Sequence, residues 1–263
     1  MRKIVVGILL ALGILYLIHI TYTRRFVQRH FAIINRTINP RPERFAILQI
    51  LNPQPDASGI LSVSLYGDLN VPSNHERYVK PLLANCNRLR EKLPGWVIRV
   101  YLSKKSGLSD ELVRKGCEVY IMNDDSTGIF WRFLPAAGDK PFLTHDADML
   151  IGEEGRGIPD LTEGVRKWQM SGKKFYRRAL GIINHIVPIS GGMFGGIARC
   201  VPDILQRMLK YDDQRFGADE IFLKREIWPL FRRDGFYSET IIPLWVLIII
   251  ILLVIYVAVK LIT

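Results

Sequence analysis

Hydrophobic residues follow two different patterns along this chain. Long continuous apolar runs occupy both ends, at residues 4–20 and 241–259, and shorter runs alternate with amphipathic stretches between them. A helix needs about 20 apolar residues to cross the hydrocarbon core of a bilayer. The run 241–259 has no charged residue, and the run 4–20 is interrupted only by His19 near its end. Both runs are therefore predicted to be transmembrane helices.

The first run has a second interpretation as a cleaved signal peptide, because Arg2 and Lys3 precede it. No small-x-small cleavage site follows it, and the bulky, basic residues 21–25 favour an uncleaved anchor. Two anchors place both termini on one side of the membrane and the middle of the chain on the other. The distribution of Lys and Arg beside the two runs favours a cytosolic middle domain. A lumenal one stays open, and only there could the sequon at Asn35 be glycosylated.

The middle of the chain divides into a connector and a folded domain. Residues 21–58 are basic and mixed with apolar positions, which fits an interfacial amphipathic helix or a plain juxtamembrane linker. The remainder, 59–237, alternates predicted strands with predicted helices. The strands are 60–66, 96–102, 117–122 and 142–144, and the helices are 75–93, 109–115 and 127–136. This alternation predicts an α/β domain with a mostly parallel, Rossmann-like sheet that binds its ligand at the carboxyl ends of the strands.

The net charge of the chain indicates less about its partners than the total suggests. The chain has 263 residues and a net charge of +11, from 36 basic and 25 acidic residues. The terminal segments 1–23 and 241–263 contain Arg2, Lys3 and Lys260 and no acid, so the middle carries +8. Several of its arginines stand next to the membrane runs, which indicates contact with lipid headgroups, and no nucleic-acid partner is expected. Three cysteines are too few for a disulfide framework.

The sequence Asp146-Ala147-Asp148 follows the fourth predicted strand. In an extended backbone, residues i and i+2 point to the same face, so both carboxylates are expected on one side and Ala147 on the other. A few carboxylates with phosphate oxygens completing the shell suit Mg²⁺ or Mn²⁺. The position after a strand therefore predicts a site for a metal ion and a diphosphate.

Several segments together resemble a poorly characterised glycosyltransferase-like family of the GT-A fold with an Asp-x-Asp motif. The resemblance covers about residues 62–228. It is carried by the segments 64–68 (SLYGD), 131–136 (WRFLPA), 146–149 (DADM), 171–173 (SGK), 191–195 (GGMFG) and 216–223 (FGADEIFL). Each segment alone is weak evidence for the resemblance, but the order and spacing of the segments together are specific.

The resemblance implies a nucleotide-sugar donor whose diphosphate is held by Mn²⁺ or Mg²⁺ on Asp146 and Asp148. A downstream histidine completes the metal shell in some such enzymes, and His185 is the candidate here. Where the family has arginine before Asp-x-Asp, this chain has His145. That change removes a permanent cation, and we expect a packed histidine at this position.

The same resemblance suggests the remaining site residues. Tyr66 and Gly67 are expected near the nucleobase or ribose, and Arg132 is expected to pair with a phosphate or to brace Asp146. Gly191 and Gly192 either let the backbone approach the ligand closely or simply form a turn.

Two acidic residues, Asp219 and Glu220, lie on a helix predicted to begin near Gly217. A carboxylate there is a candidate base for the acceptor hydroxyl in an inverting enzyme, or a positioning group in a retaining one. The alternative is a pair of solvated acids at a helix start.

We therefore expect a two-pass integral membrane, metal-dependent glycosyltransferase that acts on a glycan, lipid or protein acceptor. A sugar nucleotidyltransferase of similar fold and a catalytically inert membrane adaptor are the alternatives. The sequence leaves the sugar, the acceptor and the stereochemical course open.

Overall fold

The computed structural model describes residues 41–123, 128–153, 160–178, 188–211 and 217–237, together with Gly13. The chain divides into two compact units, and the larger, Ile34–Glu239, contains all of the described residues except Gly13. The two predicted transmembrane runs lie outside the described residues, apart from Gly13. Within the part of the chain that is described, no helix has the length and apolar character needed to cross a bilayer.

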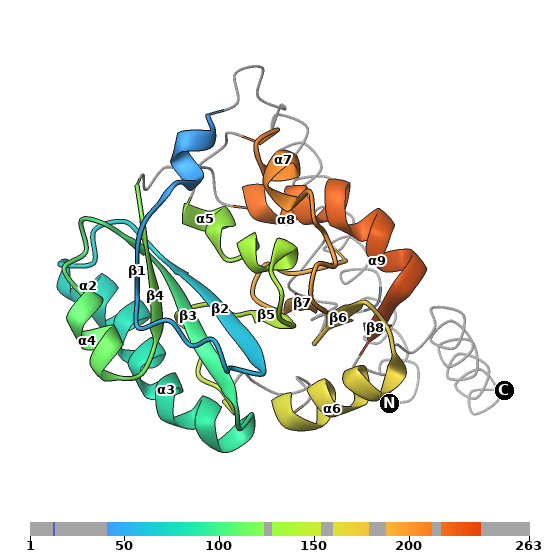
Figure 1. Ribbon diagram of the computed structural model, residues 1–263, viewed down its shortest axis with the longest axis horizontal. Helices are drawn as coiled ribbons and strands as arrows, with labels where there is room; N and C mark the ends of the chain where they lie inside the picture. Colours follow the sequence, from blue (N-terminus) through green and yellow to red (C-terminus); the bar gives the residue numbers. More distant parts are fainter. Residues whose placement is uncertain are drawn as a thin grey trace, which may run out of the picture. The chain divides into compact units, whose positions relative to one another are not determined.

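One mixed sheet organises the larger unit (Figure 1). In the described residues it has eight strands in the order β1-β4-β3-β2-β5-β7-β6-β8. Strands β4, β3, β2 and β5 run parallel to one another, whereas β1 and β7 are antiparallel to their neighbours. The strands are β1 (Ile47–Leu51), β2 (Gly59–Leu65), β3 (Trp96–Ser103), β4 (Glu118–Met122), β5 (Phe142–Thr144), β6 (Phe175–Arg177), β7 (Phe194–Gly196) and β8 (Gly235–Tyr237). The predicted α/β class, with a parallel centre, is confirmed.

The central strand β2 shows why the sheet is covered on both faces. It pairs in parallel with β3 along its whole length and with β5 on its other edge. Its residues Leu61, Val63 and Leu65 lie in one buried core cluster with α3 and α4. The alternate residue Ser64 points to the other face, where its hydroxyl accepts a hydrogen bond from the backbone of Arg132. A strand buried on both faces reads as a nearly continuous apolar run, as β2 does.

Helices cover the two faces of the sheet (Figure 1). One core combines the sheet with apolar side chains of α3 (Lys80–Lys92), α4 (Ser109–Arg114) and α6 (Leu161–Ser171). The other side carries α5 (Gly128–Trp131), α7 (Ile204–Met208), α8 (Ala218–Phe222) and α9 (Trp228–Asp234). The short helix α2 (Pro72–Asn74) follows β2.

Aromatic packing fixes the position of α5 against α8. The rings of Phe130 and Phe133 lie 5.7 and 5.5 Å from the ring of Phe222 between centroids, and all three side chains are fully buried. Edge-on and tilted ring pairs of this kind add to the free energy gained by burying apolar area. Because Phe130 and Phe133 are held in this core, Arg132 between them is directed toward the carboxyl end of the sheet.

Two helices begin with a π-helical turn, and each turn precedes a proline. His75–Val79 leads into α3 before Pro81, and Leu223–Ile227 leads into α9 before Pro229. Proline has no N–H to donate, and its ring clashes with the carbonyl four residues earlier, so a widened turn accommodates it. The predicted helix 75–93 is therefore present with a widened first turn, which carries Arg77 and Tyr78.

The sheet extends beyond the four strands that the sequence predicts. Strand β1 falls within the residues assigned to the connector 21–58, and it pairs with β4 from Ile47↔Met122 to Leu51↔Val119. Strands β6, β7 and β8 have three residues each, which is too short to show an alternating pattern. Long-range pairing rather than local sequence specifies these strands.

Candidate functional site

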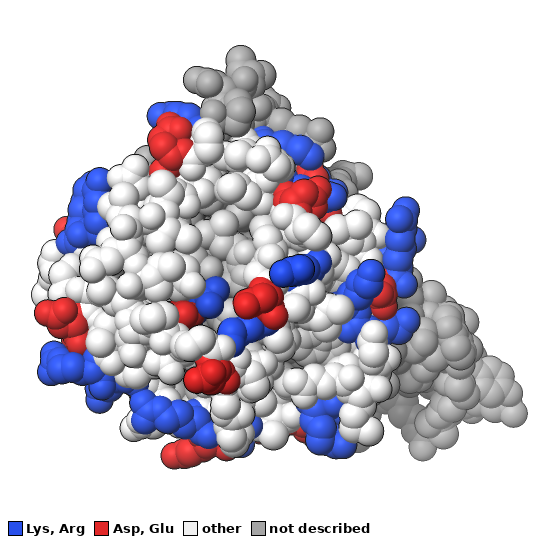
Figure 2. Space-filling view, in the orientation of Figure 1, with Lys and Arg blue, Asp and Glu red and all other residues white. Residues whose placement is uncertain are grey.

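A cleft of about 380 Å³ opens at the carboxyl ends of β2 and β5. This is the edge of a parallel sheet at which α/β proteins bind ligands. Basic and acidic side chains are interspersed on the face shown in Figure 2, without a broad basic patch. The cleft is lined by Ser64, Leu65, Tyr66, Arg77, Tyr78, Ile129, Arg132, Asp146, Ala147, Asp148, Ser190, Gly191, Gly192, Gly217, Asp219 and Glu220.

The Asp-x-Asp segment forms a turn rather than a strand. β5 ends at Thr144, and the amide of Met149 donates to the carbonyl of Asp146 at 3.2 Å. The expectation of an extended backbone with both carboxylates on one face is therefore wrong. The turn directs Asp146 toward Arg132, whereas Asp148 accepts hydrogen bonds from Nε and Nη2 of Arg77 at 3.2 and 3.1 Å. Both carboxylates nevertheless line the same cleft.

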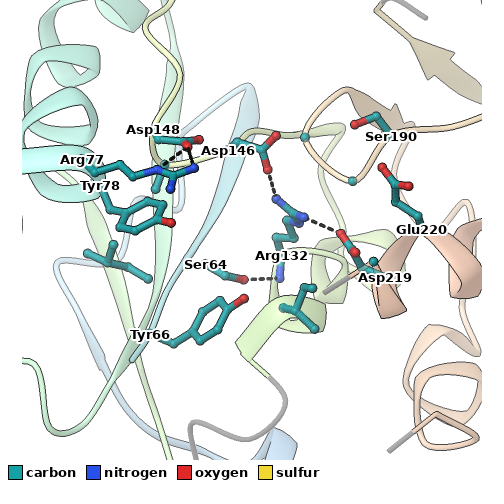
Figure 3. A pocket seen from close by; sticks show the side chains of 16 residues that line it. Ser64, Tyr66, Arg77, Tyr78, Arg132, Asp146, Asp148, Ser190, Asp219 and Glu220 are labelled. Atoms are coloured by element: carbon teal, nitrogen blue, oxygen red, sulfur yellow. Dashed lines mark hydrogen bonds and ion pairs between the residues drawn. The ribbon is translucent and has the colours of Figure 1, made fainter. Parts of the chain in front are cut away.

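Arg132 joins two carboxylates that are far apart in the sequence (Figure 3). Its Nη1 donates to Asp146, and its Nη2 donates to Oδ2 of Asp219 at 2.6 Å. Only 11% of the side chain is exposed, and within the described residues its Nε has no hydrogen-bond partner. Burial lowers the pKa of this guanidinium, but Asp146 and Asp219 outweigh burial and raise it. The site therefore keeps one fixed cation between two acids, and the sequence-based expectation that Arg132 braces Asp146 agrees with this ion pair.

Asp219 is the most deeply buried acid of the cleft. It lies in the first turn of α8, directly after Gly217 and Ala218, and it is 4% exposed. Burial raises its pKa above the ordinary aspartate value, while the charge and hydrogen bond of Arg132 oppose that shift. Glu220 follows it and also lines the cleft, with its carboxylate on the side of Ser190 in Figure 3.

The segment Ser190–Gly192 passes very close to these charged groups. A Cβ atom on Gly191 would overlap Oδ2 of Asp219 and Nη2 of Arg132, and one on Gly192 would overlap the carboxylate of Asp146. Glycine is therefore required at both positions for the backbone to approach the ion-paired cluster. Both glycines lie in a turn, which is one of the two roles expected from the sequence, whereas close approach to a ligand stays a prediction.

Aromatic side chains stand at another part of the cleft. Tyr66 directly follows β2, is 39% exposed, and packs edge-on to Trp131 with ring centroids 6.1 Å apart. Burial of its hydroxyl region raises the pKa of Tyr66, although Arg132 opposes the shift. Gly67, which was expected beside it in the site, has a φ of +84° and is not among the lining residues.

Sequence reasoning missed Arg77 and Tyr78, which both line the cleft. The guanidinium carbon of Arg77 lies 4.9 Å from the centroid of the Tyr78 ring, and the Arg77 side chain is 65% exposed. One signal could have found them. A helix that follows a parallel strand begins at the carboxyl edge of the sheet, so its first turn faces the ligand site.

The two histidines considered as ligands have different outcomes. His145 is 2% exposed, and its Nε2 lies 2.9 Å from the carbonyl of Met149 and 3.4 Å from Nδ2 of Asn85. It is a packed histidine, as expected, and it does not line the cleft. His185 lies outside the described residues.

The residues of the cleft fit a hard divalent ion only in part by themselves. Asp146 and Asp148 supply carboxylate oxygens, which Mg²⁺ and Mn²⁺ prefer. No group of three or more His, Cys, Asp or Glu side chains suited to a metal occurs among the described residues. One or both carboxylates would bind an ion here, and water and the phosphates of a substrate would supply its other ligands.

Comparison with known proteins adds no family to this geometry. No protein-family model matches the chain, and no curated protein matches it. The assignment of function therefore rests on the residues of the cleft.

Proposed function

We propose that this chain is a nucleotide-sugar-dependent glycosyltransferase of the GT-A fold. The observation that carries the proposal is a cleft at the carboxyl ends of β2 and β5 in which Asp146 and Asp219 converge on Arg132, with Asp148 and a glycine segment beside them. Two of these acids follow a strand and the third begins a helix more than 70 positions later in the sequence. Such a cleft supplies both charge for a diphosphate site and a buried carboxylate for proton transfer.

The charge balance of the cleft favours a divalent cation as part of the ligand. Four carboxylates and two guanidinium groups line it, from Asp146, Asp148, Asp219, Glu220, Arg77 and Arg132. An anionic nucleotide-sugar would meet a surplus of negative charge there. Mg²⁺ or Mn²⁺ on Asp146 and Asp148 would supply the positive charge that stabilises the leaving diphosphate as the glycosidic bond breaks.

The other lining groups suit the remaining parts of a nucleotide-sugar. Tyr66 and Tyr78 offer aromatic surface on which a nucleobase can stack. Arg77 is exposed enough to pair with a phosphate, and its planar guanidinium suits bidentate contact. Gly191 and Gly192 line the cleft beside the acids, where their backbone groups can contact the sugar.

Asp219 is the candidate general base. Its carboxylate is held in place by Arg132, and its raised pKa makes the ionised form a better proton acceptor than an ordinary aspartate. It would take the proton of the acceptor hydroxyl as that oxygen attacks the sugar. Glu220 is the neighbouring candidate for binding the acceptor.

Anchoring in the membrane is part of the same proposal. The apolar runs 4–20 and 241–259 would hold the domain at the bilayer, and the basic residues 21–40 would lie against anionic headgroups. A glycan, lipid or protein acceptor at the membrane would then be present at high local concentration.

The test is turnover by the purified full chain in detergent. A panel of nucleotide-sugars is incubated with and without Mn²⁺, and the released nucleoside diphosphate is measured. We expect metal-dependent release that Asp148→Asn abolishes. The matched control is Glu153→Gln, an exposed carboxylate that pairs with Arg88 outside the cleft at 2.6 Å.

Three other outcomes would contradict the proposal. Unchanged turnover in Asp148→Asn removes the metal role of the Asp-x-Asp segment. Formation of a nucleotide-sugar from a nucleoside triphosphate and a sugar phosphate identifies a nucleotidyltransferase. Failure to bind any nucleoside diphosphate, with or without metal, identifies an inert adaptor.

A further inference from the structure

A second cavity, of about 330 Å³, lies at the amino ends of β3 and β4. It is therefore at the opposite end of the parallel strands from the cleft. Its lining includes Gln54, Cys86, Arg90, Trp96, Lys115 and Cys117. The Sγ atoms of Cys86 and Cys117 lie 3.3 Å apart in its wall.

We propose that Cys86 and Cys117 form a redox-active dithiol, which a small hydroperoxide oxidises to an intramolecular disulfide. This inference is independent of the proposed glycosyltransferase function. It rests on the packing of the two sulfur atoms against each other and on the cavity that reaches them.

The fold itself holds the two sulfur atoms together. Cys86 lies on the buried face of α3, and its Sγ is 3.5 Å from the carbonyl of Leu82. Cys117 directly precedes β4. Its amide donates to Leu112 at 3.0 Å, and its carbonyl accepts from Nδ2 of Asn52 at 2.9 Å. The sulfur atoms need to close by about 1.3 Å to reach an S–S bond of about 2.0 Å.

The surroundings distinguish the two thiols chemically. The hydrogen bond with Cys117 lowers the pKa of Cys86 most, and the charges of Arg90 and Lys115 lower it further against the effect of burial. The same contact and burial raise the pKa of Cys117. Arg90 and Lys115 both favour the thiolate of Cys86, so we assign the first attack to Cys86, because nucleophilic attack on a peroxide requires the thiolate.

The reaction balances without any further reactant. The Cys86 thiolate attacks one oxygen of the hydroperoxide, the O–O bond breaks, and the leaving oxygen takes a proton to become an alcohol or water. The product on Cys86 is a sulfenic acid. Cys117 then attacks that sulfur, the S–O bond breaks, and water leaves as the disulfide forms. Two thiols are oxidised by two electrons in total, and one peroxide is reduced.

The bond would join α3 to the start of β4 across 31 positions of sequence that include β3 and α4. Closing a segment of this length restricts the unfolded chain and stabilises the folded one. The redox state of Cys86 and Cys117 in cells would also indicate whether the domain is cytosolic or lumenal, which the sequence leaves open. The dithiol persists in a reducing cytosol, whereas the disulfide persists in an oxidising lumen.

The experiment uses the full chain, first fully reduced and then exposed to a few equivalents of hydrogen peroxide. Free thiols are counted, the intact mass is measured, and linked peptides are mapped. We expect two of the three thiols to disappear, a loss of about 2 Da, and a Cys86–Cys117 peptide. The melting temperature should rise by about 5 °C or more and return after reduction.

Cys200 provides the matched control, because burial raises its pKa to about 12 and its Sγ lies against the carbonyl of Ala136 at 3.8 Å. Cys200→Ser should form the same disulfide, whereas Cys86→Ser and Cys117→Ser should show neither the linked peptide nor the rise in melting temperature. Three free thiols after exposure would overturn the proposal. So would oxidation that stops at sulfinic acid, or disulfides found only between molecules through Cys200.

Discussion

Two buried arginine–carboxylate groups lie at opposite ends of the parallel strands, and they differ in charge balance. At the amino end of β4, Nε of Arg99 donates to Oε2 of Glu118 at 2.5 Å. The two side chains are 12% and 5% exposed, and the residues are direct partners in the β3–β4 register. The guanidinium carbon of Arg99 also lies 4.5 Å from the centroid of the Tyr120 ring. One cation there faces one anion.

At the carboxyl end, Arg132 is equally buried but faces two carboxylates, Asp146 and Asp219, with two further acids and Arg77 in the same cleft. Its partners come from separate parts of the chain and line an open cleft. A group that serves stability alone gains nothing from surplus buried charge, because each unbalanced charge costs solvation energy. The comparison teaches that charge balance, more than burial, separates a structural ion pair from a candidate ligand site.

The largest expected effect is on Asp219. Asp219→Asn keeps the shape of the side chain but removes the base, so turnover should fall by roughly 10²–10⁴-fold. The assay is release of nucleoside diphosphate by the purified chain, with Asp203→Asn as the control, an exposed acid paired with Arg207. Retained turnover in Asp219→Asn would make the Arg132 cluster structural, like the Arg99 pair.

Glu118→Gln should lower the stability of the fold and leave turnover unchanged. It leaves Arg99 buried without its counter-ion, so the free energy of unfolding should fall by about 3 kcal/mol. Denaturant unfolding measures that loss. Turnover at a temperature where the variant stays folded should be unchanged. A loss of turnover without a loss of stability would contradict the assignment of the Arg99–Glu118 pair as structural.

The pH dependence of turnover follows from the raised pKa of Asp219. Burial raises this pKa above 3.8, and the carboxylate must be ionised to accept a proton. Turnover should therefore fall as the pH decreases through a pKa higher than that of an ordinary aspartate. A profile of kcat/KM between about pH 4 and pH 8 measures it. An acid limb at or below 3.8 would contradict the assignment.

The smallest effect on stability is expected at an exposed ion pair, with which the two buried groups can be compared. Asp160 caps α6 through the amides of Thr162 and Glu163 and pairs with Lys92 at 3.0 Å. Asp160→Asn keeps the cap but removes the charge, so unfolding at neutral pH should lose less than about 1 kcal/mol.

The hydrogen bond from Lys92 is the main cause that lowers the pKa of Asp160 below 3.8. A group whose folded pKa is depressed stabilises the fold above its unfolded pKa and loses that contribution as the pH falls through the folded one. The difference between wild type and Asp160→Asn should therefore shrink as the pH falls below 3.8 and vanish below the pKa of Asp160 in the folded state. A difference that persists there would show that the substitution acts through the cap.

The sequence predicted the parallel centre of the sheet because its strands are long apolar runs separated by helices. β2, β3, β4 and β5 all match predicted strands within one residue. β1 lies in a segment that was interpreted as a basic connector, and it joins the sheet by pairing with β4. β7 has three residues and no periodic signal, and it was missed, whereas the equally short β5 was predicted directly before the Asp-x-Asp segment.

The residues of the site were predicted by type, but of their ion pairs only the one between Arg132 and Asp146 was expected. Asp146, Arg132, Gly192 and Asp219 were singled out, but no local pattern shows that one guanidinium would bridge two of these acids. Arg77 read as one more polar residue on an amphipathic helix. Its place in the cleft depends on where the helix begins relative to the sheet edge, which is a property of the fold.

The most direct test of the central claim is binding of a nucleoside diphosphate to the full chain, measured as the change in melting temperature with and without Mn²⁺. A bound ligand stabilises the fold by mass action. The account predicts a rise that requires both nucleotide and Mn²⁺, persists in Glu153→Gln and is lost in Asp148→Asn. An equal rise in Asp148→Asn, or no rise with any nucleoside diphosphate, would contradict it.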